Sequence, residues 1–379
     1  MRVLIWDNIG EDFVGGNREQ RVRTAEALRA LGVAVTEYEG TDPVFAGHDV
    51  MHAFGLGIGG LRAARRYGIP IALSTIFHPY GGWPRPCTAA ERWRWARTRY
   101  RESAKAFRET WRGRNVAYCS GRLAGRHRAR VRFEMADLLL PNSRSEADTI
   151  VEQLGVTTPQ HVVPNAADPA RFDFDPQADD GERRYVTLVG RIEKLKNQLG
   201  LIEAMRTRDY PVMIVGPAKN RQNEQYLARC RRRATANIEF VGPRTGDDLV
   251  AVYRKTKVHA LPSDSETTGL VSLEAALCGA NVVTTDRGYA RDYFGDLAWY
   301  CRSNSPASIR AAVDAAYAAP FRSALRDKIR AQYTWEAAAK ATRAGYEKLL
   351  NERGYRRAAI EGTRDDHATD AMAMGLAAP

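Results

Sequence analysis

Two glutamates with seven residues between them, Glu266 and Glu274, flank a short loop that contains Gly269. The apolar run before Glu266 ends at a proline, as a buried strand would, and residues 270–280 carry apolar side chains at helical spacing. We therefore expect Glu266 in a loop and Glu274 one turn into a helix. A helix N-terminus suits a phosphate and a nearby carboxylate suits sugar hydroxyls, which together describe a nucleotide-sugar. An ordinary loop acid and a charge on a helix face are the alternative.

Two cations five residues apart, Arg191 and Lys196, follow another expected strand at residues 185–190. A diphosphate leaving group gains negative charge as the bond to its sugar breaks. Fixed cations beside it therefore stabilise the transition state more than the ground state. A solvated basic loop is the alternative, and Lys194, which lies between the two, is assigned no role.

A pair of glycines, Gly15 and Gly16, precedes an expected helix at residues 18–32. Glycine lets the backbone approach a ligand closely, and the N-terminus of the helix suits a phosphate. The dinucleotide fingerprint G-x-G-x-x-G is absent from the chain, which argues against a nicotinamide enzyme. The pair therefore indicates a second ligand-facing loop, in the first half of the chain.

Short apolar strands alternate with helices along the chain, which predicts α/β architecture with parallel, doubly wound sheets. The pattern restarts after the polar stretch at residues 172–184, so we expect two such units joined near residues 165–182, with a cleft between them. Ligands of these sheets bind at the carboxyl ends of the strands, where all of the loops described above lie. The expected strands occupy residues 2–6, 33–38, 49–55, 70–75, 135–143, 185–190, 212–216, 238–242, 258–263 and 281–286.

Composition excludes several classes of protein. A chain of 379 residues, 44% hydrophobic and 27% charged, fits two globular domains and excludes a disordered or fibrous protein. The N-terminus has too short an apolar run for a signal peptide, and no run of eighteen apolar residues follows, so we expect a cytoplasmic protein. The cysteines lack the spacing of a zinc site or a disulfide framework and are expected as free thiols. They are Cys87, Cys119, Cys230, Cys278 and Cys301.

One basic segment, residues 85–132, holds fifteen Lys or Arg against three acids, an excess equal to the whole net charge of +12. A capping box predicts a helix from Thr88, and a stripe of aromatic and alanine residues predicts its buried face. The opposite face carries Arg92, Trp95 and Arg99. Such a face suits anionic phospholipids, an acidic glycan or nucleic acid, and a merely solvated face is the alternative.

Four segments carry a resemblance to one known family: VGRIEKLKN, PSDSETTGLVSLEAALCGANVV, VVPNAADPARF and YTWEAAAKATRAGYEKLL. Together they resemble the retaining GT-B glycosyltransferases of family 4, the glycosyl transferases group 1, over residues 1 to about 352. The resemblance implies two Rossmann-like domains that face a central cleft. It also implies a UDP- or GDP-linked sugar as the donor substrate and no cofactor.

The resemblance also implies roles for the loop that contains the two glutamates. Glu274 is expected to bind the ribose hydroxyls and Glu266 the transferred sugar, with the backbone of Gly269 and Leu270 near the diphosphate. Family members usually carry Gly-aromatic-Gly after the first glutamate, whereas this chain has Thr267 and Thr268 before its glycine. That departure bears on which sugar is preferred.

Three further assignments rest on the same resemblance. His78, immediately beyond an expected strand, matches the histidine of the first domain that faces the donor and can hydrogen-bond a sugar hydroxyl. A loop histidine held by packing is the alternative, and His52 is a competing candidate. The position of the glycine pair Gly15–Gly16 matches the glycine loop of the family, and Arg244 is expected near the nucleotide base.

We expect four parts in the chain. Residues 1–168 form an acceptor-side domain with the basic helical insert 85–132, and residues 169–335 form the nucleotide-sugar domain. A helix at 336–352 crosses back to the first domain, and residues 353–379 form a loose tail. The sequence makes no prediction of the oligomeric state.

The function predicted is retaining transfer of a sugar from a nucleoside diphosphate donor to an acceptor hydroxyl, in glycan or glycolipid synthesis. No Asp or His cluster with metal-ligand spacing is visible, and the cations Arg191 and Lys196 can supply the charge that a metal would. One alternative is a nucleotide-sugar epimerase or phosphorylase on the same fold. Another, motivated by the basic segment, is a nucleic-acid-directed glycosyltransferase or a nucleic-acid-binding protein. Peripheral contact with the inner face of the membrane is the alternative to a purely cytoplasmic protein.

Overall fold

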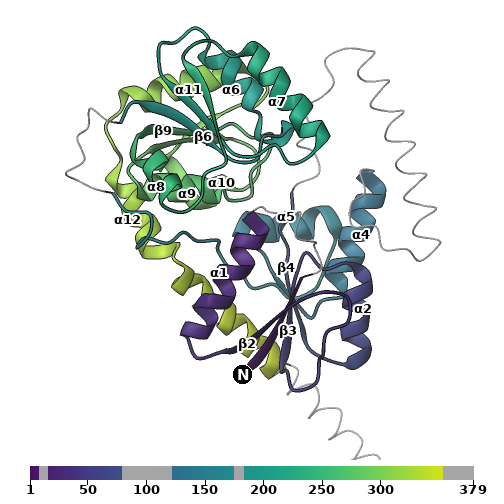
Figure 1. Cartoon of the computed structure of the whole chain (residues 1–379). Coiled ribbons are helices and arrows are strands. Elements are labelled where there is room, and N and C mark those ends of the chain that lie inside the picture. Colours follow the sequence, from purple (N-terminus) through teal and green to yellow (C-terminus); the bar gives the residue numbers. More distant parts are fainter. Residues whose placement is uncertain (8–15, 79–121, 175–182, 353–379) are drawn as a thin grey trace, which may run out of the picture.

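Two parallel sheets, each covered by helices, form the two halves of the molecule (Figure 1). The computed structural model describes residues 1–7, 16–78, 122–174 and 183–352. The neighbouring strands within each sheet of the described residues pair in parallel. This confirms the doubly wound α/β architecture expected from the alternating pattern.

The first sheet has five strands in the order β2-β1-β3-β4-β5. The three central strands are almost wholly buried, as expected of parallel strands with helices on both faces, whereas the edge strand β2 alternates between exposed and half-buried residues. The strands are β1 Arg2–Asp7, β2 Ala34–Glu39, β3 Val50–Phe54, β4 Ile71–Ser74 and β5 Leu138–Leu140. Its helices are α1 Gly16–Ala30, α2 Ile58–Tyr67, α4 Arg122–Glu134 and α5 Arg144–Leu154.

The second sheet has six strands in the order β11-β10-β9-β6-β7-β8. The chain winds outward from β6 in one direction and then restarts at β9 in the other, so the strand order reverses between β6 and β9. The strands are β6 Tyr185–Val189, β7 Val212–Val215, β8 Ile238–Gly242, β9 Thr256–Leu261, β10 Asn281–Thr285 and β11 Trp299–Cys301. The helices are α6 Gln198–Met205, α7 Arg221–Arg233, α8 Gly246–Arg254, α9 Leu270–Leu277, α10 Ala290–Phe294, α11 Pro306–Ala318 and α12 Ser323–Gln332, with short 3₁₀ turns η2 Lys194–Lys196 and η3 Gly295–Leu297.

The C-terminal helix, described over residues 335–352, runs from the second domain back along the first (Figure 1). Its buried side chains Ala339 and Tyr346 belong to the same hydrophobic cluster as Val3, Ile5 and other residues of the first sheet. The Tyr346 hydroxyl also lies 2.6 Å from Nδ1 of His52 in β3. Residues far apart in sequence thus share one core, which ties the C-terminal end of the described chain to the first domain.

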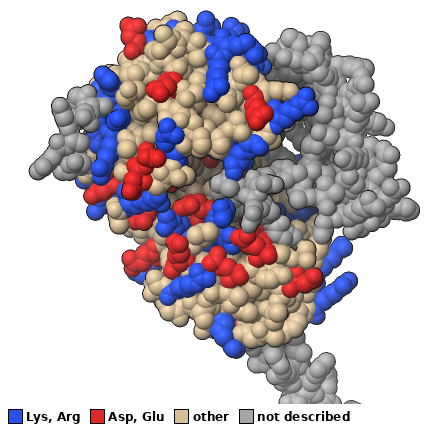
Figure 2. All heavy atoms as spheres, viewed as in Figure 1, with Lys and Arg blue, Asp and Glu red and all other residues tan. Residues whose placement is uncertain are grey.

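The basic segment 85–132 lies largely outside the described residues, and so do Arg92, Trp95 and Arg99. Helix α7, with five arginines, contributes a further basic surface, and Figure 2 shows Lys and Arg side chains over the part of the second domain occupied by α6 and α7. Acidic and basic side chains intermingle on the visible face of the first domain (Figure 2). On the face shown in Figure 2, basic side chains therefore gather most clearly on the second domain.

Three cysteines, Cys230, Cys278 and Cys301, are buried free thiols, which confirms the expectation for these positions. The other two lie outside the described residues. In the described part of the chain, no helix is both long and apolar enough to cross a membrane.

Candidate functional site

Lys196 and Glu266 meet at the point where the strand order of the second sheet reverses. Lys196 ends the 3₁₀ turn after β6, and Glu266 lies in the loop after β9; these two strands are neighbours. The Lys196 Nζ donates to Glu266 Oε2 at 2.7 Å, and the Ser263 hydroxyl donates to the same oxygen at 3.2 Å. Loops at the carboxyl ends of adjacent strands at such a reversal form the usual ligand crevice of these sheets.

The Glu266 carboxyl is almost wholly buried, at 5% exposure, yet it is held in its charged form. Burial raises its pKa, but the Lys196 charge and hydrogen bond, the nearby His78 and the Ser263 hydroxyl together bring the pKa below its ordinary value. A buried carboxylate paired with one cation is therefore present at this site at neutral pH. It can accept hydrogen bonds from the hydroxyl groups of a sugar.

His78 reaches this pair from the first domain. Its side chain is exposed to solvent, but the protein that surrounds it lowers its pKa, first by desolvation. The charge of Glu266 raises the pKa of His78 and that of Lys196 lowers it, so both residues lie within electrostatic reach across the two domains. The structure thus brings together three of the residues singled out in the sequence. His52, the competing candidate, is buried between Tyr346 and Ser74 with its pKa lowered to about 3 by desolvation.

The backbone on both sides of Glu266 is clamped by the loop after β10, a contact that sequence reasoning missed. The Glu266 N–H donates to the carbonyl of Arg287 at 3.1 Å, and the Tyr289 N–H donates to the Glu266 carbonyl at 2.8 Å. Gly288 lies between them with φ of +95°, and a Cβ atom there would lie 2.1 Å from the Glu266 carbonyl oxygen. Only glycine fits this close approach. In the sequence, Gly288 is a lone glycine after an aspartate and an arginine, and nothing in that pattern predicts its close approach to Glu266.

Arg191 follows the same strand, β6, but pairs with a different carboxylate. The Arg191 Nη2 atom lies 2.9 Å from Glu193 Oε1, and the Arg191 side chain is 30% exposed. Gly216, at the end of the neighbouring strand β7, would place a Cβ atom 1.9 Å from the carbonyl oxygen of Gly190, so glycine is required there for the two loops to lie side by side. Lys194 is exposed.

Glu274 lies in α9, one turn after the helix begins at Leu270. The Tyr253 hydroxyl donates to its Oε2 at 2.8 Å. Burial raises the pKa of Glu274 to about 7, and Glu19 of the first domain adds to the shift, while the Tyr253 hydrogen bond and the charges of Arg171 and Arg23 oppose it. Since Glu19 and Arg23 belong to α1, Glu274 faces both domains, as expected of a residue that lines the space between them.

The loop between the glutamates is shaped by glycine and threonine. Gly269 adopts φ of +82° and precedes α9, which requires glycine or a residue tolerant of the left-handed region. Thr268, which stands where the family usually has an aromatic residue, accepts a hydrogen bond at 3.0 Å from the Asn165 side chain. The Asn165 N–H in turn donates to the Tyr293 hydroxyl at 2.9 Å, and that hydroxyl donates to the carbonyl of Asn142 in the first domain at 2.5 Å. The threonine therefore ties the loop to the interface of the two domains.

Gly16, the first residue of α1, lies against this loop. A Cβ atom at Gly16 would lie 3.3 Å from Cδ1 of Leu270. The first helix of the first domain thus meets the start of α9, where Gly16 and Leu270 were both expected to line the site. Gly15 lies outside the described residues.

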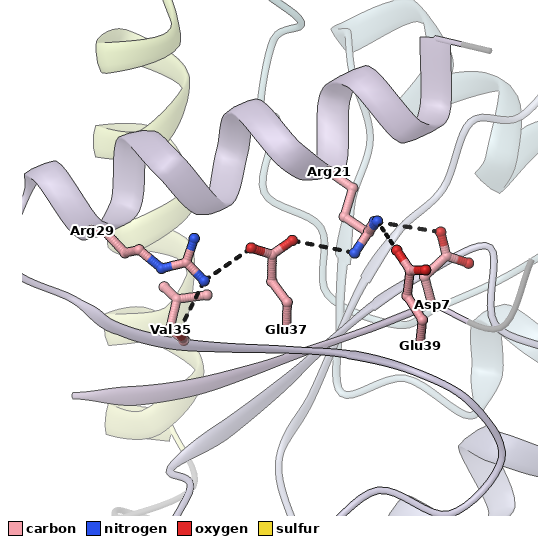
Figure 3. Close-up of polar contacts among 6 residues, drawn as sticks. All are labelled: Asp7, Arg21, Arg29, Val35, Glu37 and Glu39. Carbon is pink, nitrogen blue, oxygen red and sulfur yellow. Dashed lines mark hydrogen bonds and ion pairs between the residues drawn. The ribbon is translucent and has the colours of Figure 1, made fainter. Parts of the chain in front are cut away.

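A buried arginine fixes α1 on the first sheet (Figure 3). The Arg21 guanidinium, 4% exposed, lies 3.2 Å from Glu37 Oε2 and 3.7 Å from Asp7 Oδ2, and it also pairs with Glu39. Arg29, eight residues further along the helix, lies 2.9 Å from Glu37 Oε1. Removing one member of such a network would leave buried charge uncompensated. The network therefore holds the helix whose N-terminus contacts the site.

Arg244, expected near the nucleotide base, is exposed just beyond β8 and donates to the carbonyl of Pro243. Among the described residues, no three His, Cys, Asp or Glu side chains are grouped so as to hold a metal ion.

Comparison with known proteins finds similarity mainly in the second domain. Residues 170–334 match the model of the family described as Glycosyl transferases group 1. Two proteins described as D-inositol 3-phosphate glycosyltransferase, from Corynebacterium jeikeium and Salinispora arenicola, are 32% and 34% identical over 176 and 182 residues. Each match covers 40% of this chain and 42% or 40% of the relative, so the chain spans less than half the length of these curated relatives. A glycogen synthase from Mycobacterium tuberculosis is 28% identical over 64% of this chain and 62% of its own length.

Solved structures confirm the fold over most of the chain. Sucrose-phosphate synthase from Thermosynechococcus elongatus superposes with a TM-score of 0.72 at 15% identity and covers 93% of this chain and 100% of its own. Anabaena HepE in complex with UDP and glucose gives a TM-score of 0.60 at 14% identity, with 94% of this chain and 99% of its own covered. The architecture is the GT-B fold, and the resemblance to glycosyl transferases group 1 is confirmed through residues 170–334.

Proposed function

We propose that this chain, whose residues 170–334 match the glycosyl transferases group 1, is a retaining glycosyltransferase that uses a nucleoside diphosphate sugar and no metal ion. The observation that carries the proposal is the Lys196–Glu266 pair at 2.7 Å, with His78 of the other domain within electrostatic reach. A buried carboxylate, a cation and a histidine converge there from two domains. This combination suits a sugar whose leaving group is an anion.

The leaving diphosphate would be stabilised by Arg191 and Lys196, the two cations of the loop after β6. Both are already positioned by carboxylates, Arg191 by Glu193 and Lys196 by Glu266. Cations that are fixed before the reaction need no reorganisation when charge develops on the diphosphate. Glu266 would accept hydrogen bonds from the transferred sugar, and His78 would hydrogen-bond a sugar hydroxyl from the opposite side.

Retention would follow from displacement on one face of the sugar. The bond between the anomeric carbon and the diphosphate oxygen breaks, and the acceptor oxygen forms its bond to that carbon on the same face. The acceptor proton passes to the departing phosphate oxygen, so the step needs no separate base. The described carboxylate closest to the proposed sugar site, Glu266, already accepts from Lys196 and Ser263 through Oε2, which suits a binding role better than nucleophilic attack.

The donor base is proposed to be uracil or guanine, with Glu274 on the ribose hydroxyls and the Gly269 and Leu270 backbone at the diphosphate. Two related structures favour testing UDP-sugars first, since the HepE protein is described in complex with UDP and with UDP-glucose. The acceptor would be a hydroxyl of a glycan or glycolipid bound by the first domain. The basic segment 85–132 would meet an anionic acceptor, a membrane surface or nucleic acid.

A panel of UDP-, GDP- and ADP-sugars tests the donor site. A ligand that binds the folded state alone raises the melting temperature, by an amount that grows with its concentration over its dissociation constant. We expect a UDP- or GDP-sugar to stabilise the protein and the same ligand to stabilise a Lys196→Ala variant much less. No shift with any of the three classes would refute the donor site.

Transfer itself is tested with the donor that binds, a mixture of acceptors and chelator in the buffer. NMR coupling at the anomeric proton of the product reports the stereochemistry. A product with the donor's anomeric configuration, formed at the same rate with and without chelator, is expected. An inverted product would refute retention, and loss of turnover in chelator that is restored by a divalent cation would refute metal independence.

A further inference from the structure

Glu146, in the first turn of α5, is a wholly buried carboxyl outside the proposed donor site. It accepts three hydrogen bonds: from the Thr75 hydroxyl at 2.5 Å and the Phe77 N–H at 2.7 Å through Oε1, and from the Asn142 N–H at 2.9 Å through Oε2. The carboxyl group thus acts as the acceptor in all three contacts. A buried carboxyl with this many donors is a built feature of the fold, since burial alone would be costly.

The donors come from the ends of two neighbouring strands. Thr75 and Phe77 follow β4, and Asn142 follows β5. Glu146 therefore joins the two loops at the carboxyl edge of the first sheet. Sequence reasoning missed this role. The serine three residues earlier, Ser143, accepts from the Glu146 N–H at 3.1 Å and is the N-cap of α5, so a Ser-x-x-Glu pattern was the available signal.

Between the two Glu146 donors of the first loop lies Ile76, which has a φ of +44°. A β-branched residue rarely adopts the left-handed region, because its Cβ substituents clash with the backbone. Such a conformation persists only where the surroundings determine it. Here a single carboxylate oxygen holds the residue before and the residue after Ile76, which are the contacts able to impose the turn.

The residue that follows this turn is His78. We propose that Glu146 is a positioning residue for His78: by accepting from Thr75 and Phe77 it holds the strained turn at Ile76 and so directs the histidine toward Lys196 and Glu266. This inference rests on the proposed function, in which His78 contacts the sugar. Glu146 itself contacts neither the donor nor the reacting atoms. Its effect is carried through the backbone of residues 75–77.

At position 146, the carboxylate of glutamate satisfies the three donors better than the amide of glutamine would. Glutamine would offer one acceptor oxygen and an NH₂ group, and the NH₂ would face a backbone N–H that also needs an acceptor. Glu146→Gln therefore keeps the size of the side chain but turns its NH₂ group toward either the Asn142 N–H or the Phe77 N–H, so at least one contact that fixes the side chain is lost. Glu152→Gln, on the exposed surface of the same helix, is the matched control for loss of a negative charge.

In the transfer assay, Glu146→Gln is expected to lower kcat by roughly 10- to 100-fold, the effect of misplacing one group of a preorganised site. The donor KM should change little, because Arg191, Lys196 and Glu274 are untouched. Thr75→Val, which removes one of the three donors without changing shape, should act in the same direction and more weakly. If the Glu146→Gln variant does not fold, the Thr75→Val variant replaces it in this test. Wild-type kcat in folded Glu146→Gln or in folded Thr75→Val would overturn the proposal.

The strained turn gives a second and more specific test. Glycine adopts positive φ without steric cost, so Ile76→Gly in the Glu146→Gln background should recover kcat by roughly 10-fold. Ile76→Val, which is also β-branched, should recover nothing. A merely structural role of Glu146 predicts no difference between these two double variants, and that outcome would refute the mechanism through Ile76.

The His78 ring provides a readout that does not depend on sugar transfer. The histidine titration is followed by NMR and assigned with a His78→Gln variant. In the wild type the pKa of His78 is expected below the ordinary value, because of desolvation by the surrounding protein and the charge of Lys196. In Glu146→Gln it should return toward that value, and in Glu152→Gln it should not. If the wild type transfers no sugar, the proposed function fails while this shift still supports the clamp; an unchanged His78 titration in folded Glu146→Gln refutes the clamp alone.

Discussion

Lys196 and Glu266 form an ion pair at 2.7 Å although 70 residues separate them in the chain. Their loops follow β6 and β9, which are adjacent at the reversal of strand order. The pair leaves a buried carboxylate charged and a cation fixed in direction. Both properties suit the proposed binding of a neutral sugar beside an anionic leaving group.

Loss of either cation at the proposed diphosphate site should be costly. Lys196→Ala or Arg191→Ala is expected to lower turnover by roughly 10²-fold or more, because a preorganised charge is removed where negative charge develops. Steady-state kinetics with saturating donor measures the effect. Lys194→Ala, an exposed lysine in the same loop, is the control and should keep wild-type turnover. Turnover near that of the wild type in both the Lys196 and Arg191 variants would rule out the assignment.

Donor binding should depend on pH through Glu274. Its pKa is raised to about 7 by burial, so the carboxyl becomes protonated as pH falls through that value and then binds ribose hydroxyl donors less well. We expect the dissociation constant of the donor, measured by calorimetry, to rise as pH falls below about 7. Tyr253→Phe removes a hydrogen bond that lowers this pKa, so the inflection should move to higher pH. A donor affinity that is flat across this range, with Glu274→Gln behaving like wild type, would contradict the role.

The same group makes a stability prediction with a definite sign. The folded-state pKa of Glu274 lies above the ordinary glutamate value of 4.5, so its contribution favours the folded state most at pH below about 4.5. That contribution is lost as pH rises through about 7, where burial of the charged form is unfavourable. Compared with the wild type, Glu274→Gln should therefore gain relative stability as pH is raised, which urea unfolding at several pH values measures.

Gly288 should be far less tolerant of alanine than other glycines with positive φ. Gly288→Ala would place a Cβ atom 2.1 Å from the Glu266 carbonyl oxygen and must displace the Glu266 loop, so both stability and kcat should fall. Gly32→Ala is the matched control: its φ is +79°, but nothing lies within 4 Å of the added atom. The control should lose about 1 kcal/mol from the backbone conformation alone and keep its kcat. Equal losses in the two variants would show that the close approach is unimportant.

The C-terminal helix should be essential and the residues beyond it dispensable. Truncation before Tyr346 removes a side chain buried in the core of the first sheet and the hydroxyl that contacts His52, so it should abolish soluble expression or cause a large drop in melting temperature. Deletion of residues 357–379 should leave melting temperature and turnover unchanged. Comparable damage from the two deletions would refute this division.

Charge reversal at Arg92 and Arg99 tests the basic segment, which lies outside the described residues. If that face receives an anionic acceptor, the acceptor KM should rise while donor binding hardly changes, and added salt should reduce the effect because exposed charges are screened over ~8 Å. Trp95→Ala should act in the same direction with weaker salt dependence. Unchanged acceptor kinetics, together with unchanged binding to anionic liposomes, acidic glycans and duplex DNA, would leave a solvated arginine face.

The sequence by itself determined the local environment of the main site residues. The apolar run before Glu266, the glycine at 269 and the helical spacing that follows predict strand, loop and helix, because each depends on neighbours within one or two turns. The alternating pattern likewise predicted parallel sheets, and the recurring segments indicated the GT-B fold. Arg191 and Lys196 were identified for the same reason, as polar residues directly after a strand.

Tertiary structure alone decided which of these loops meet and what holds them. Strand order is set by packing over the whole domain, so only the fold places β6 beside β9 and joins Lys196 to Glu266. The difference between His52 and His78 is likewise nonlocal, since His52 is buried by Tyr346 at a separation of 294 residues. Gly288 and Glu146 escaped notice because their partners belong to other loops, and a close backbone approach or a buried carboxylate clamp exists only once distant segments of the chain are packed together.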